Sequence, residues 1–274
     1  MVWSWNIQGI GNKLALLRAA MLPSPPDVML LHETLTTADR APSFPGYEVY
    51  HTPWDRSDSS GSRGMVTAVR VDLPHTPAVT TTAGHTTVQS TDIRPGPDAV
   101  TCVNLYTHPR HNTDLQTITN THPRHLVLGD FNASSRVWSS TRETPQGAHL
   151  AEELLEADTA LVTTPFAPTS ISGSTIDLAF ASLDIAPRVT WDQVDTLVSD
   201  HIATQVTLKD ALAPASTAQR PRWALRRANW AVYTTHLELG SQWVHPTGHL
   251  DEDNEALSGA VDRAAETSIP RTSD

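Results

Sequence analysis

The stretch His125-Leu-Val-Leu-Gly-Asp-Phe-Asn132 places an acid and an amide directly after an apolar run. Its first four residues have the character of a buried strand, and we expect Gly129 to end that strand. Alternate side chains of extended chain share a face, so Asp130 and Asn132 are predicted to point the same way and Phe131 into the core. Strand ends of α/β sheets often carry chemistry, although an isolated aspartate there is more often a turn or cap residue. The stretch therefore indicates a site only if other segments supply partners.

Composition narrows the class of protein. The chain has 274 residues, a formal net charge of −11 and a single cysteine, Cys102. One cysteine cannot form a disulfide framework, which favours an intracellular protein. No apolar stretch approaches the ~18 residues of a membrane span, and the first residues do not form a signal peptide, so we expect no membrane partner. The acidic charge argues against tight nonspecific binding of nucleic acid, but not against an enzyme that meets phosphates through a metal ion.

Apolar runs along the chain predict a strand-rich fold of two similar halves. We expect strands at Val2–Ile7, Asp27–Leu31, Tyr47–His51, Gly64–Arg70, Thr86–Ile93, Ala99–Tyr106, Ala160–Thr163, Ser174–Ala181, Val189–Leu197 and Ala203–Lys209. Helices are predicted after a cap at Asn12, over Gln146–Ala157 and, more weakly, over Asn112–Asn120. Because strands outnumber helices and each half has a helical crossover, the predicted fold class is α/β, a four-layer α/β/β/α sandwich of two packed, mainly antiparallel sheets.

The composition changes after residue 210. We expect one domain over residues 1–210, followed by a linker and a partly helical tail over residues 211–274. Ala213–Thr217 is rich in Pro, Ala and Ser, as linkers are. The tail has too little apolar surface to form a core of its own.

Polar residues stand where the apolar runs end, and in such a sandwich these ends meet on one rim. They are Asn6, Glu33, Tyr106, Asp130, Asn132, Asp177, Asp200 and His201. One carboxylate can anchor a hard divalent ion, for which Mg²⁺ is the best candidate, and a second can activate water. A histidine held by an aspartate, with amide and phenol donors, can meet the charge that grows on phosphate oxygens. The set predicts metal-assisted phosphodiester hydrolysis, and the absence of zinc-type spacing disfavours a zinc hydrolase.

The same residues lie in ordered motifs that resemble the endonuclease/exonuclease/phosphatase superfamily, which includes apurinic endonucleases and deoxyribonuclease I. The motifs are Trp5-Asn6-Ile7-Gln8-Gly9, Leu31-His32-Glu33, Asn104-Leu105-Tyr106, Gly129-Asp130-Phe131-Asn132, Ile176-Asp177 and Ser199-Asp200-His201. Trp138-Ser139-Ser140, Pro168-Thr169 and the run from Ser174 to Ser182 resemble the endonuclease domains of non-LTR retrotransposons. Arg222-Trp223…Ala228-Asn229-Trp230 is similar to the connector that precedes the reverse transcriptase in those polyproteins. The resemblance covers roughly residues 2–235.

The resemblance implies a metal centre with Glu33 as the main ligand. Asp200 would lie beside the metal or at a second metal position. Gln8 stands where repair enzymes of the superfamily often carry an aspartate ligand, and an amide oxygen binds Mg²⁺ more weakly than a carboxylate. The implied cofactor is Mg²⁺, with Mn²⁺ as the alternative.

The resemblance also implies how water and phosphate are handled. Asp130 would orient or deprotonate the attacking water, with Asn6 and Asn132 holding the water and the phosphate. His201, paired to Asp177, would contact the scissile phosphate.

Two further side chains receive roles from the resemblance. Tyr106 would donate to the phosphate or the leaving group, and Thr169 would line the phosphate site. Besides Gln8, three positions depart from the pattern: Pro109 replaces an asparagine, and Ser134 and Ser135 replace histidines. These departures concern substrate contacts and rate more than the class of reaction.

The implied function is a Mg²⁺-dependent DNA endonuclease of a non-LTR retroelement. It would nick one strand of the target DNA and leave a 3′-hydroxyl for a reverse transcriptase, normally part of the same polyprotein. Action in the nucleus is expected in a eukaryotic host, and the missing reverse transcriptase suggests a truncated or split reading frame. An apurinic endonuclease or another phosphoesterase of the same fold remains an alternative, as does a non-catalytic remnant of a retroelement.

Overall fold

The computed structural model describes residues 1–22, 24–55, 63–96, 98–139, 142–194, 199–209, 224, 227–241 and 250–270. The chain divides into two compact units, Met1–Ala213 and Pro214–Asp274. Among the described helices, none combines the length and apolar character needed to cross a membrane.

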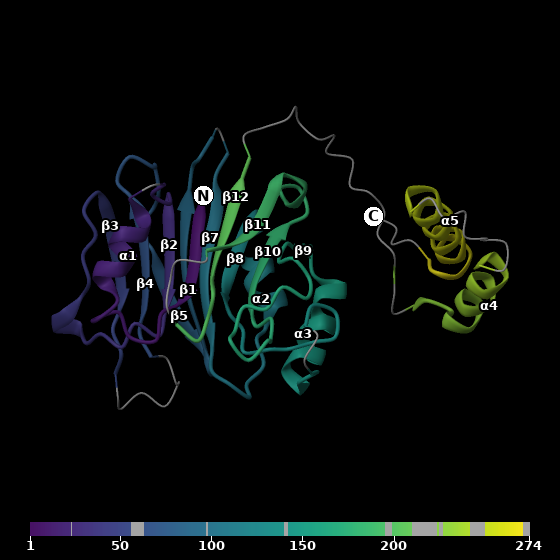
Figure 1. Ribbon diagram of the computed structural model, residues 1–274, viewed down its shortest axis with the longest axis horizontal. Helices are drawn as coiled ribbons and strands as arrows, with labels where there is room; N and C mark the ends of the chain where they lie inside the picture. Colours follow the sequence, from purple (N-terminus) through teal and green to yellow (C-terminus); the bar gives the residue numbers. More distant parts are fainter. Residues whose placement is uncertain are drawn as a thin grey trace. The chain divides into compact units, whose positions relative to one another are not determined.

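The first unit consists of two six-stranded sheets that lie face to face (Figure 1). In the first sheet the spatial order is β11 (Val189–Val194), β12 (Ala203–Leu208), β1 (Val2–Asn6), β2 (Val28–His32), β4 (Met65–Arg70) and β3 (Tyr47–Thr52). In the second it is β5 (Val79–Ala83), β6 (Thr86–Ile93), β7 (Val100–Thr107), β8 (His125–Asp130), β10 (Asp177–Ser182) and β9 (Thr159–Leu161). Short 3-10 turns occur at Ala38–Arg40 and Ala186–Arg188.

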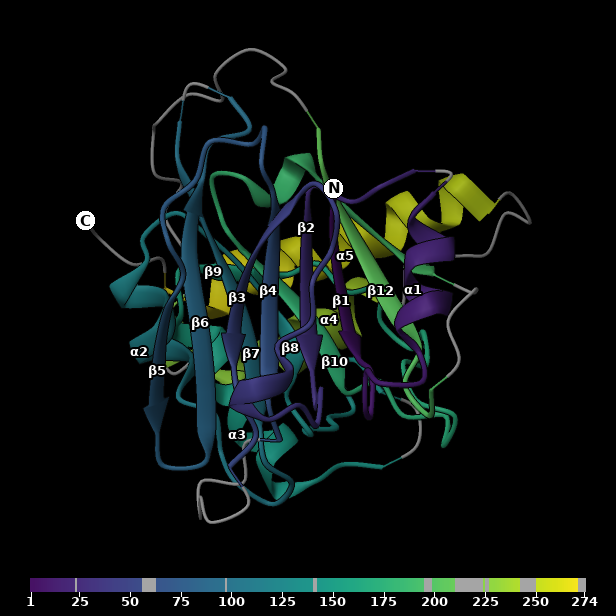
Figure 2. The same ribbon diagram turned by 90° about the vertical axis from the view of Figure 1, so that its left-hand side faces the viewer.

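Both sheets follow one plan. Each has a parallel pair at its centre, β1–β2 in one and β7–β8 in the other, and the remaining described pairs are antiparallel. A parallel pair needs a crossover connection, which α1 (Leu14–Met21) supplies for the first and α2 (Leu115–Thr121) for the second. Figure 2 shows β1 and β2 side by side with their arrowheads at the same end.

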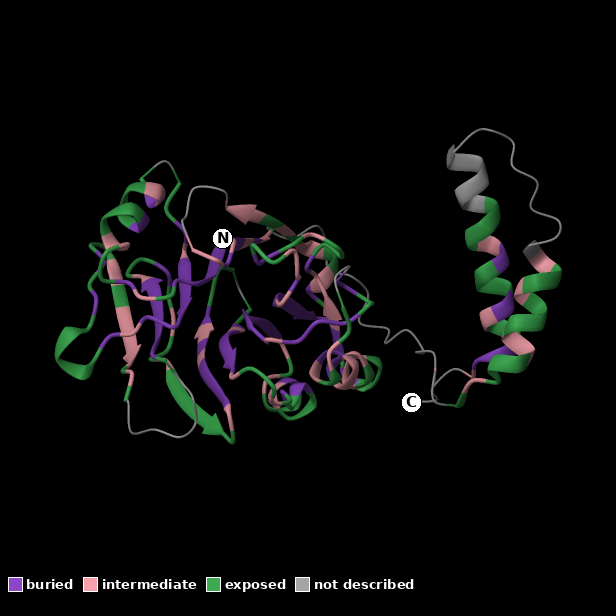
Figure 3. Cartoon of the chain, turned by 60° about the horizontal axis from the view of Figure 1, so that its bottom comes forward, coloured by how far each residue is buried: buried purple, intermediate pink, exposed green. Residues whose placement is uncertain are grey.

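Three helices cover the outer faces of the two sheets. Helix α1 buries Leu17 and Met21 against the first sheet, whose outer face presents Trp5 and Leu31. Helices α2 and α3 (Pro145–Glu156) cover the second sheet, and buried residues fill the space between the sheets (Figure 3). The four-layer α/β/β/α sandwich predicted from the sequence is confirmed.

The space between the sheets changes character along the strands. Its apolar part includes Leu30, Cys102 and Leu128, which lie in the middle of β2, β7 and β8. Two residues further along the same strands, on the same face, the side chains are His32, Asn104 and Asp130. These three are buried as well. The sandwich is therefore held together at one end by apolar packing and carries buried polar groups at the other.

Three details differ from the sequence-based prediction. Gly129 does not end its strand, because β8 continues to Asp130. A Cβ at Gly129 would lie 1.8 Å from the Leu105 oxygen, so glycine permits the close approach of β7 and β8. The cap of α1 is Lys13, not Asn12. Strand β5 went unpredicted because all of its residues are exposed, so it has no buried face to give an alternating pattern.

The second unit contains α4 (Trp230–Ser241) and α5 (Leu250–Ser268), which pack against each other. Ala260 and Ala264 of α5 are buried. The linker Ala213–Thr217 and the motif residues Arg222 and Trp223 lie outside the described residues.

Candidate active site

The register of the strands gathers the predicted residues at the polar end of the sandwich. Asn6 pairs with His32 across β1 and β2. In the second sheet Asp130 of β8 lies between Tyr106 of β7 and Asp177 of β10. The two sheets therefore present these side chains on a common rim.

The backbone turns sharply where it leaves the rim. Gln8, Glu33 and Asn132 have φ angles of 45°, 49° and 47°, and they are three of only six described non-glycine residues with positive φ. This left-handed conformation costs about 1–2 kcal/mol per residue, so the surrounding structure must enforce it. The Ile7 amide donates to the His32 oxygen at 3.0 Å and the Gly9 amide to the Glu33 oxygen at 2.8 Å, which fixes two of these turns together.

The turn at Asn132 corrects the prediction that Asp130 and Asn132 lie on one extended strand. The main-chain amide of Asn132 donates to Asp130 Oδ1 at 2.9 Å. The side-chain Nδ2 of Asn132 donates to the main-chain oxygen of Thr107, also at 2.9 Å. Phe131 is fully buried, as predicted. Asn132 thus holds Asp130 and joins β8 to β7.

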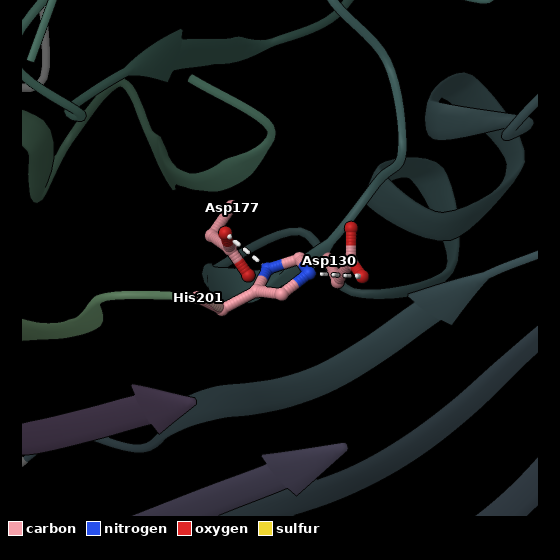
Figure 4. Close-up of side chains that lie close together, drawn as sticks. All are labelled: Asp130, Asp177 and His201. Atoms are coloured by element: carbon pink, nitrogen blue, oxygen red, sulfur yellow. Dashed lines mark hydrogen bonds and ion pairs between the residues drawn. The ribbon is translucent and has the colours of Figure 1, made fainter. Parts of the chain in front are cut away.

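Asp130, Asp177 and His201 form a buried centre in which the imidazole lies between the two carboxylates (Figure 4). His201 Nδ1 donates to Asp177 Oδ2 at 2.8 Å, and His201 Nε2 lies 3.9 Å from Asp130 Oδ2. The side chains are 9%, 3% and 1% exposed for His201, Asp177 and Asp130. Three ionisable side chains are therefore desolvated together.

This arrangement raises the pKa of both His201 and Asp130, although burial alone would lower the pKa of the histidine. Burial lowers the pKa of His201, but the ion pair and hydrogen bond with Asp177, helped by Asp130 and Asp200, raise it to about 10. Burial, followed by the charge of Asp177, raises the pKa of Asp130, which makes it a stronger base than an exposed carboxylate. At neutral pH His201 is therefore a cation, and its Nε2 lies on the side of Asp130.

Neighbouring groups fix the centre on all sides. Asn6 Nδ2 donates to Asp130 Oδ2 at 2.9 Å. Trp5 Nε1 donates to the His201 oxygen at 3.1 Å, and the His201 backbone forms a β-bridge with Ser170. The buried centre is thus held by the backbone as well as by its own ion pair.

Glu33 forms a second, more open centre with Tyr106 and Arg63. Tyr106 donates its hydroxyl to Glu33 Oε1 at 3.0 Å, and Arg63 Nη1 donates to Glu33 Oε2 at 2.7 Å. Burial, with the charges of Glu33 and Asp130, raises the pKa of Tyr106, so the phenol keeps its proton and acts as a donor. The influence of both carboxylates on Tyr106 indicates that it lies between the two centres.

Gln8 and Asp200 meet at the outer edge of the rim. Gln8 Nε2 donates to Asp200 Oδ2 at 2.6 Å. Lys13 lies beside them: its ammonium donates to the main-chain oxygens of Ile7 and Gln8, and Asp200 raises its pKa against a larger lowering by burial. This edge therefore also combines a carboxylate with a cation.

Thr169 lies behind the rim. It is fully buried, and its Oγ1 accepts the amides of Ile176 and Asp177, both at 2.9 Å. In the structure Thr169 positions the first residue of β10, and its contact with a phosphate stays a prediction.

The donors at the rim fit a hard divalent cation. Asp130, Asp177 and His201 each offer a ligand atom within 4.8 Å of the others. This cluster includes an imidazole, whereas the carboxylate and amide groups of Glu33, Asp200 and Gln8 offer only the oxygen donors that Mg²⁺ prefers. The guanidinium of Arg63 on Glu33 Oε2 shows that a positive charge is stabilised there. The chemistry of the site thus fits an ion on the Glu33 side.

Sequence reasoning assigned no role to three residues that the structure brings to the rim: Arg63, Lys13 and His32. Arg63 ends a polar turn just before Gly64, and only the pairing of β4 with β2 shows that it faces Glu33. His32 is fully buried, and burial lowers its pKa to about 4, so it is neutral at pH 7. The one sequence signal for these residues was their adjacency to Gly64, Asn12 and Glu33.

Comparison with known proteins agrees with this geometry. The family model described as endonuclease-reverse transcriptase matches residues 100–205, which run from the start of β7 into β12. The chain is similar to the endonuclease/exonuclease/phosphatase superfamily. The resemblance stated from the motifs is therefore confirmed.

Two curated relatives from Drosophila melanogaster are polymerases of mobile elements. The chain is 23% identical to the RNA-directed DNA polymerase from mobile element jockey over 97% of its own length and 30% of that protein. It is 27% identical to the probable RNA-directed DNA polymerase from transposon X-element over 85% of its own length and 26% of that protein. The chain thus spans less than a third of the length of either relative.

Solved structures of the superfamily share the fold. The endonuclease domain of TRAS1, a telomere-specific non-LTR retrotransposon, aligns with a TM-score of 0.62 and 21% identity over 76% of this chain and 97% of that domain. The APE2 catalytic domain of Xenopus laevis aligns with a TM-score of 0.60 and 16% identity over 76% of this chain and 91% of that domain. Both likenesses concern the fold.

Proposed function

We propose that this chain is a metal-dependent DNA endonuclease domain of a non-LTR retroelement. It hydrolyses a phosphodiester bond in one strand of duplex DNA and leaves a 3′-hydroxyl that a reverse transcriptase can extend. The reverse transcriptase would belong to the same polyprotein, and the reaction would take place in the nucleus of a eukaryotic host.

The observation that carries the proposal is the buried ion pair of His201 and Asp177 facing Asp130, next to Glu33. A base, a cation and an anionic metal ligand on one rim are the parts that hydrolysis of a phosphodiester requires. Desolvating two carboxylates and an imidazole together is costly for a protein that uses them only to support its fold. The mobile-element polymerases and the retrotransposon endonuclease among the similar proteins favour DNA as the substrate.

Each residue has a part in the reaction. Asp130, held by Asn6 and by the Asn132 amide, accepts a proton from the attacking water as the water oxygen bonds to phosphorus. A Mg²⁺ or Mn²⁺ ion held by Glu33, with Asp200 and Gln8 near it, would neutralise charge on the phosphate. The bond between phosphorus and the 3′ oxygen breaks, and that oxygen takes a proton from solvent water to become the 3′-hydroxyl.

Two hydrogen-bond donors can stabilise the negative charge that develops on the phosphate oxygens. The His201 cation faces the space beside Asp130, where it can donate from Nε2 to a non-bridging oxygen. Tyr106 keeps its proton and can turn its hydroxyl from Glu33 to the phosphate or the leaving oxygen. A cleft of about 450 Å³ lined by Gly9, Thr34 and Arg40 adjoins the rim and offers room for DNA beyond the scissile bond.

Nicking of supercoiled plasmid tests the proposal. The full chain with Mg²⁺ should convert supercoiled plasmid to the open circle, and polymerase extension of the nick should show a free 3′-hydroxyl. Asp130→Asn and His201→Gln should abolish most of the conversion while keeping the circular dichroism of the wild type. A wild-type protein that leaves the plasmid supercoiled at micromolar concentration would refute the nuclease and favour a non-catalytic remnant.

A duplex with one abasic site separates the retroelement endonuclease from a repair enzyme. The apurinic-type structures align about as well as the retrotransposon domain, with TM-scores of 0.60 against 0.62. We expect similar cleavage of abasic and intact duplexes of one sequence. A strong preference for the abasic duplex would replace the retroelement assignment by apurinic-site repair.

A further inference from the structure

Arg63 occupies the position on Glu33 that a divalent metal ion would take. Its Nη1 donates to Glu33 Oε2 at 2.7 Å, while Tyr106 engages Oε1 at 3.0 Å, so both oxygens of the carboxylate have a partner. A divalent ion held by Glu33 would take the place of the guanidinium, because two cations at one oxygen repel each other. Arg63 therefore needs a second position.

The main chain of Arg63 is fixed beside the catalytic glutamate. The Leu35 amide donates to the Arg63 oxygen at 3.0 Å, and the Thr34 amide to the Gly64 oxygen at 3.1 Å. Gly64 has a φ of +87°, and a Cβ there would lie 2.7 Å from Thr34 Oγ1, so only glycine lets the two segments approach this closely. Any movement of Arg63 is consequently a movement of its side chain at the rim.

The Arg63 side chain has the exposure that such a movement requires. It is 45% exposed, whereas the side chain of Glu33 is 9% exposed. The planar guanidinium binds carboxylate and phosphate with the same pair of parallel N–H donors. A guanidinium displaced from Glu33 would remain at the rim, close to where the substrate phosphate approaches.

We propose that Arg63 is a phosphate-binding residue that exchanges partners. It neutralises Glu33 in the free protein and moves to a non-bridging oxygen of the substrate once a divalent ion occupies Glu33. The inference rests on the metal-dependent function proposed above. It has two consequences of opposite sign, since the same side chain weakens metal binding and strengthens DNA binding.

Metal binding is measured first, without DNA, from the electron paramagnetic resonance of free Mn²⁺ in the presence of the full chain. Arg63→Met keeps most of the apolar stem and removes the charge, and it should bind Mn²⁺ about fivefold more tightly, the scale of a partly exposed ion pair. Glu33→Gln should lose the site. The matched control is Arg188→Met, because Arg188 donates to the Lys209 oxygen where β12 ends, at the opposite end of the sandwich, and it should leave Mn²⁺ affinity unchanged.

DNA binding is measured next by fluorescence anisotropy of a labelled duplex in Ca²⁺, with cleavage monitored on a gel. Arg63→Met should weaken binding about tenfold through the loss of a charge-assisted phosphate contact. It should also lower the slope of log affinity against log salt by about 0.9, the value for one phosphate contact. Arg63→Lys should keep the Mn²⁺ affinity of the wild type and only part of its DNA affinity.

The outcomes separate this inference from the proposed function. An Arg63→Met protein that binds Mn²⁺ no more tightly than wild type, or that keeps the DNA affinity and salt slope, overturns the exchange of partners. If wild type binds Mn²⁺ and nicks plasmid in either case, the proposed function stands alone. If wild type and Glu33→Gln bind Mn²⁺ equally, the metal site on Glu33 fails and the role of Arg63 fails with it.

Discussion

Each of the two centres on the rim balances its carboxylates with a cation, but the two cations differ in how far they are buried. Around Asp130, the cation that balances the carboxylates is His201, which is buried and bonded to Asp177. Around Glu33, the balancing cation is Arg63, whose side chain is 45% exposed. We call the first centre closed, because its cation is buried. We call the second centre open, because its cation is partly exposed and can be replaced by another.

The difference follows from which elements supply the residues. Asp130 and Asp177 sit opposite each other on adjacent strands, so the register of the second sheet sets their spacing. Glu33 lies one residue beyond β2, and Arg63 comes from the segment that precedes β4. A pair fixed by strand register suits a base and its helper, which must keep one geometry, and a loop-borne cation suits a place that a metal and a phosphate enter in turn.

The largest expected effect comes from the closed centre. Asp130→Asn keeps the shape and can still accept the hydrogen bond from Asn6 through its one amide oxygen, but it cannot accept a proton from water. The initial rate of plasmid nicking should fall about 10³-fold, in the range for loss of a general base. Glu143→Gln, which neutralises an exposed carboxylate on a different loop, is the control and should nick at the wild-type rate. A loss of less than tenfold for Asp130→Asn would assign the base to another group.

Asp177→Asn tests whether the buried ion pair also holds the fold. Leaving His201 without its carboxylate should lower the free energy of unfolding by about 3 kcal/mol, measured with urea near pH 7. The pKa of His201 in the folded protein, about 10, lies above its ordinary value of 6.5, so the pair's contribution is complete below pH 6.5. It is lost as the pH rises through 10, and this pH dependence should be absent in the variant.

An unfolding free energy that is equal for wild type and Asp177→Asn at pH 7 would show that the pair serves catalysis alone. The closed centre would then behave like an exposed ion pair, which contributes at most about 1 kcal/mol to stability.

Tyr106→Phe tests the link between the two centres. The change removes the donor to Glu33 Oε1 and leaves the ring in place, so the protein should keep its melting temperature to within a few degrees. The nicking rate should fall about tenfold, the effect of losing one donor to developing charge in a site with other donors. A rate loss that disappears at saturating Mg²⁺ would place Tyr106 in metal binding instead of in the reaction.

The sequence predicted the closed part of the molecule better than the open part. Apolar runs identified the inner strands, and polar residues at their ends identified Asp130, Asp177 and His201, because buried strands constrain residue types strongly. Arg63 carries no such constraint, since its neighbours on both sides are a polar turn and a glycine. The left-handed turn at Asn132 was missed for a related reason: asparagine tolerates both extended and left-handed backbone, and only the contacts with Asp130 and Thr107 decide between them.

The smallest expected effect concerns the outer edge, where Gln8→Asp would make the open centre more dependent on a metal. Gln8 Nε2 donates to Asp200 Oδ2 at 2.6 Å, and an aspartate would replace this bond by repulsion between two carboxylates. Because Gln8 is exposed, solvent screens that repulsion, and the gain in Mn²⁺ affinity should be only about threefold. Asn12→Asp adds the same charge to an exposed position of the following turn and should leave the affinity unchanged. Equal gains in the two variants would mean that the added negative charge alone raises the Mn²⁺ affinity and that position 8 supplies no metal ligand. Metal binding would then depend on Glu33 and Asp200 alone.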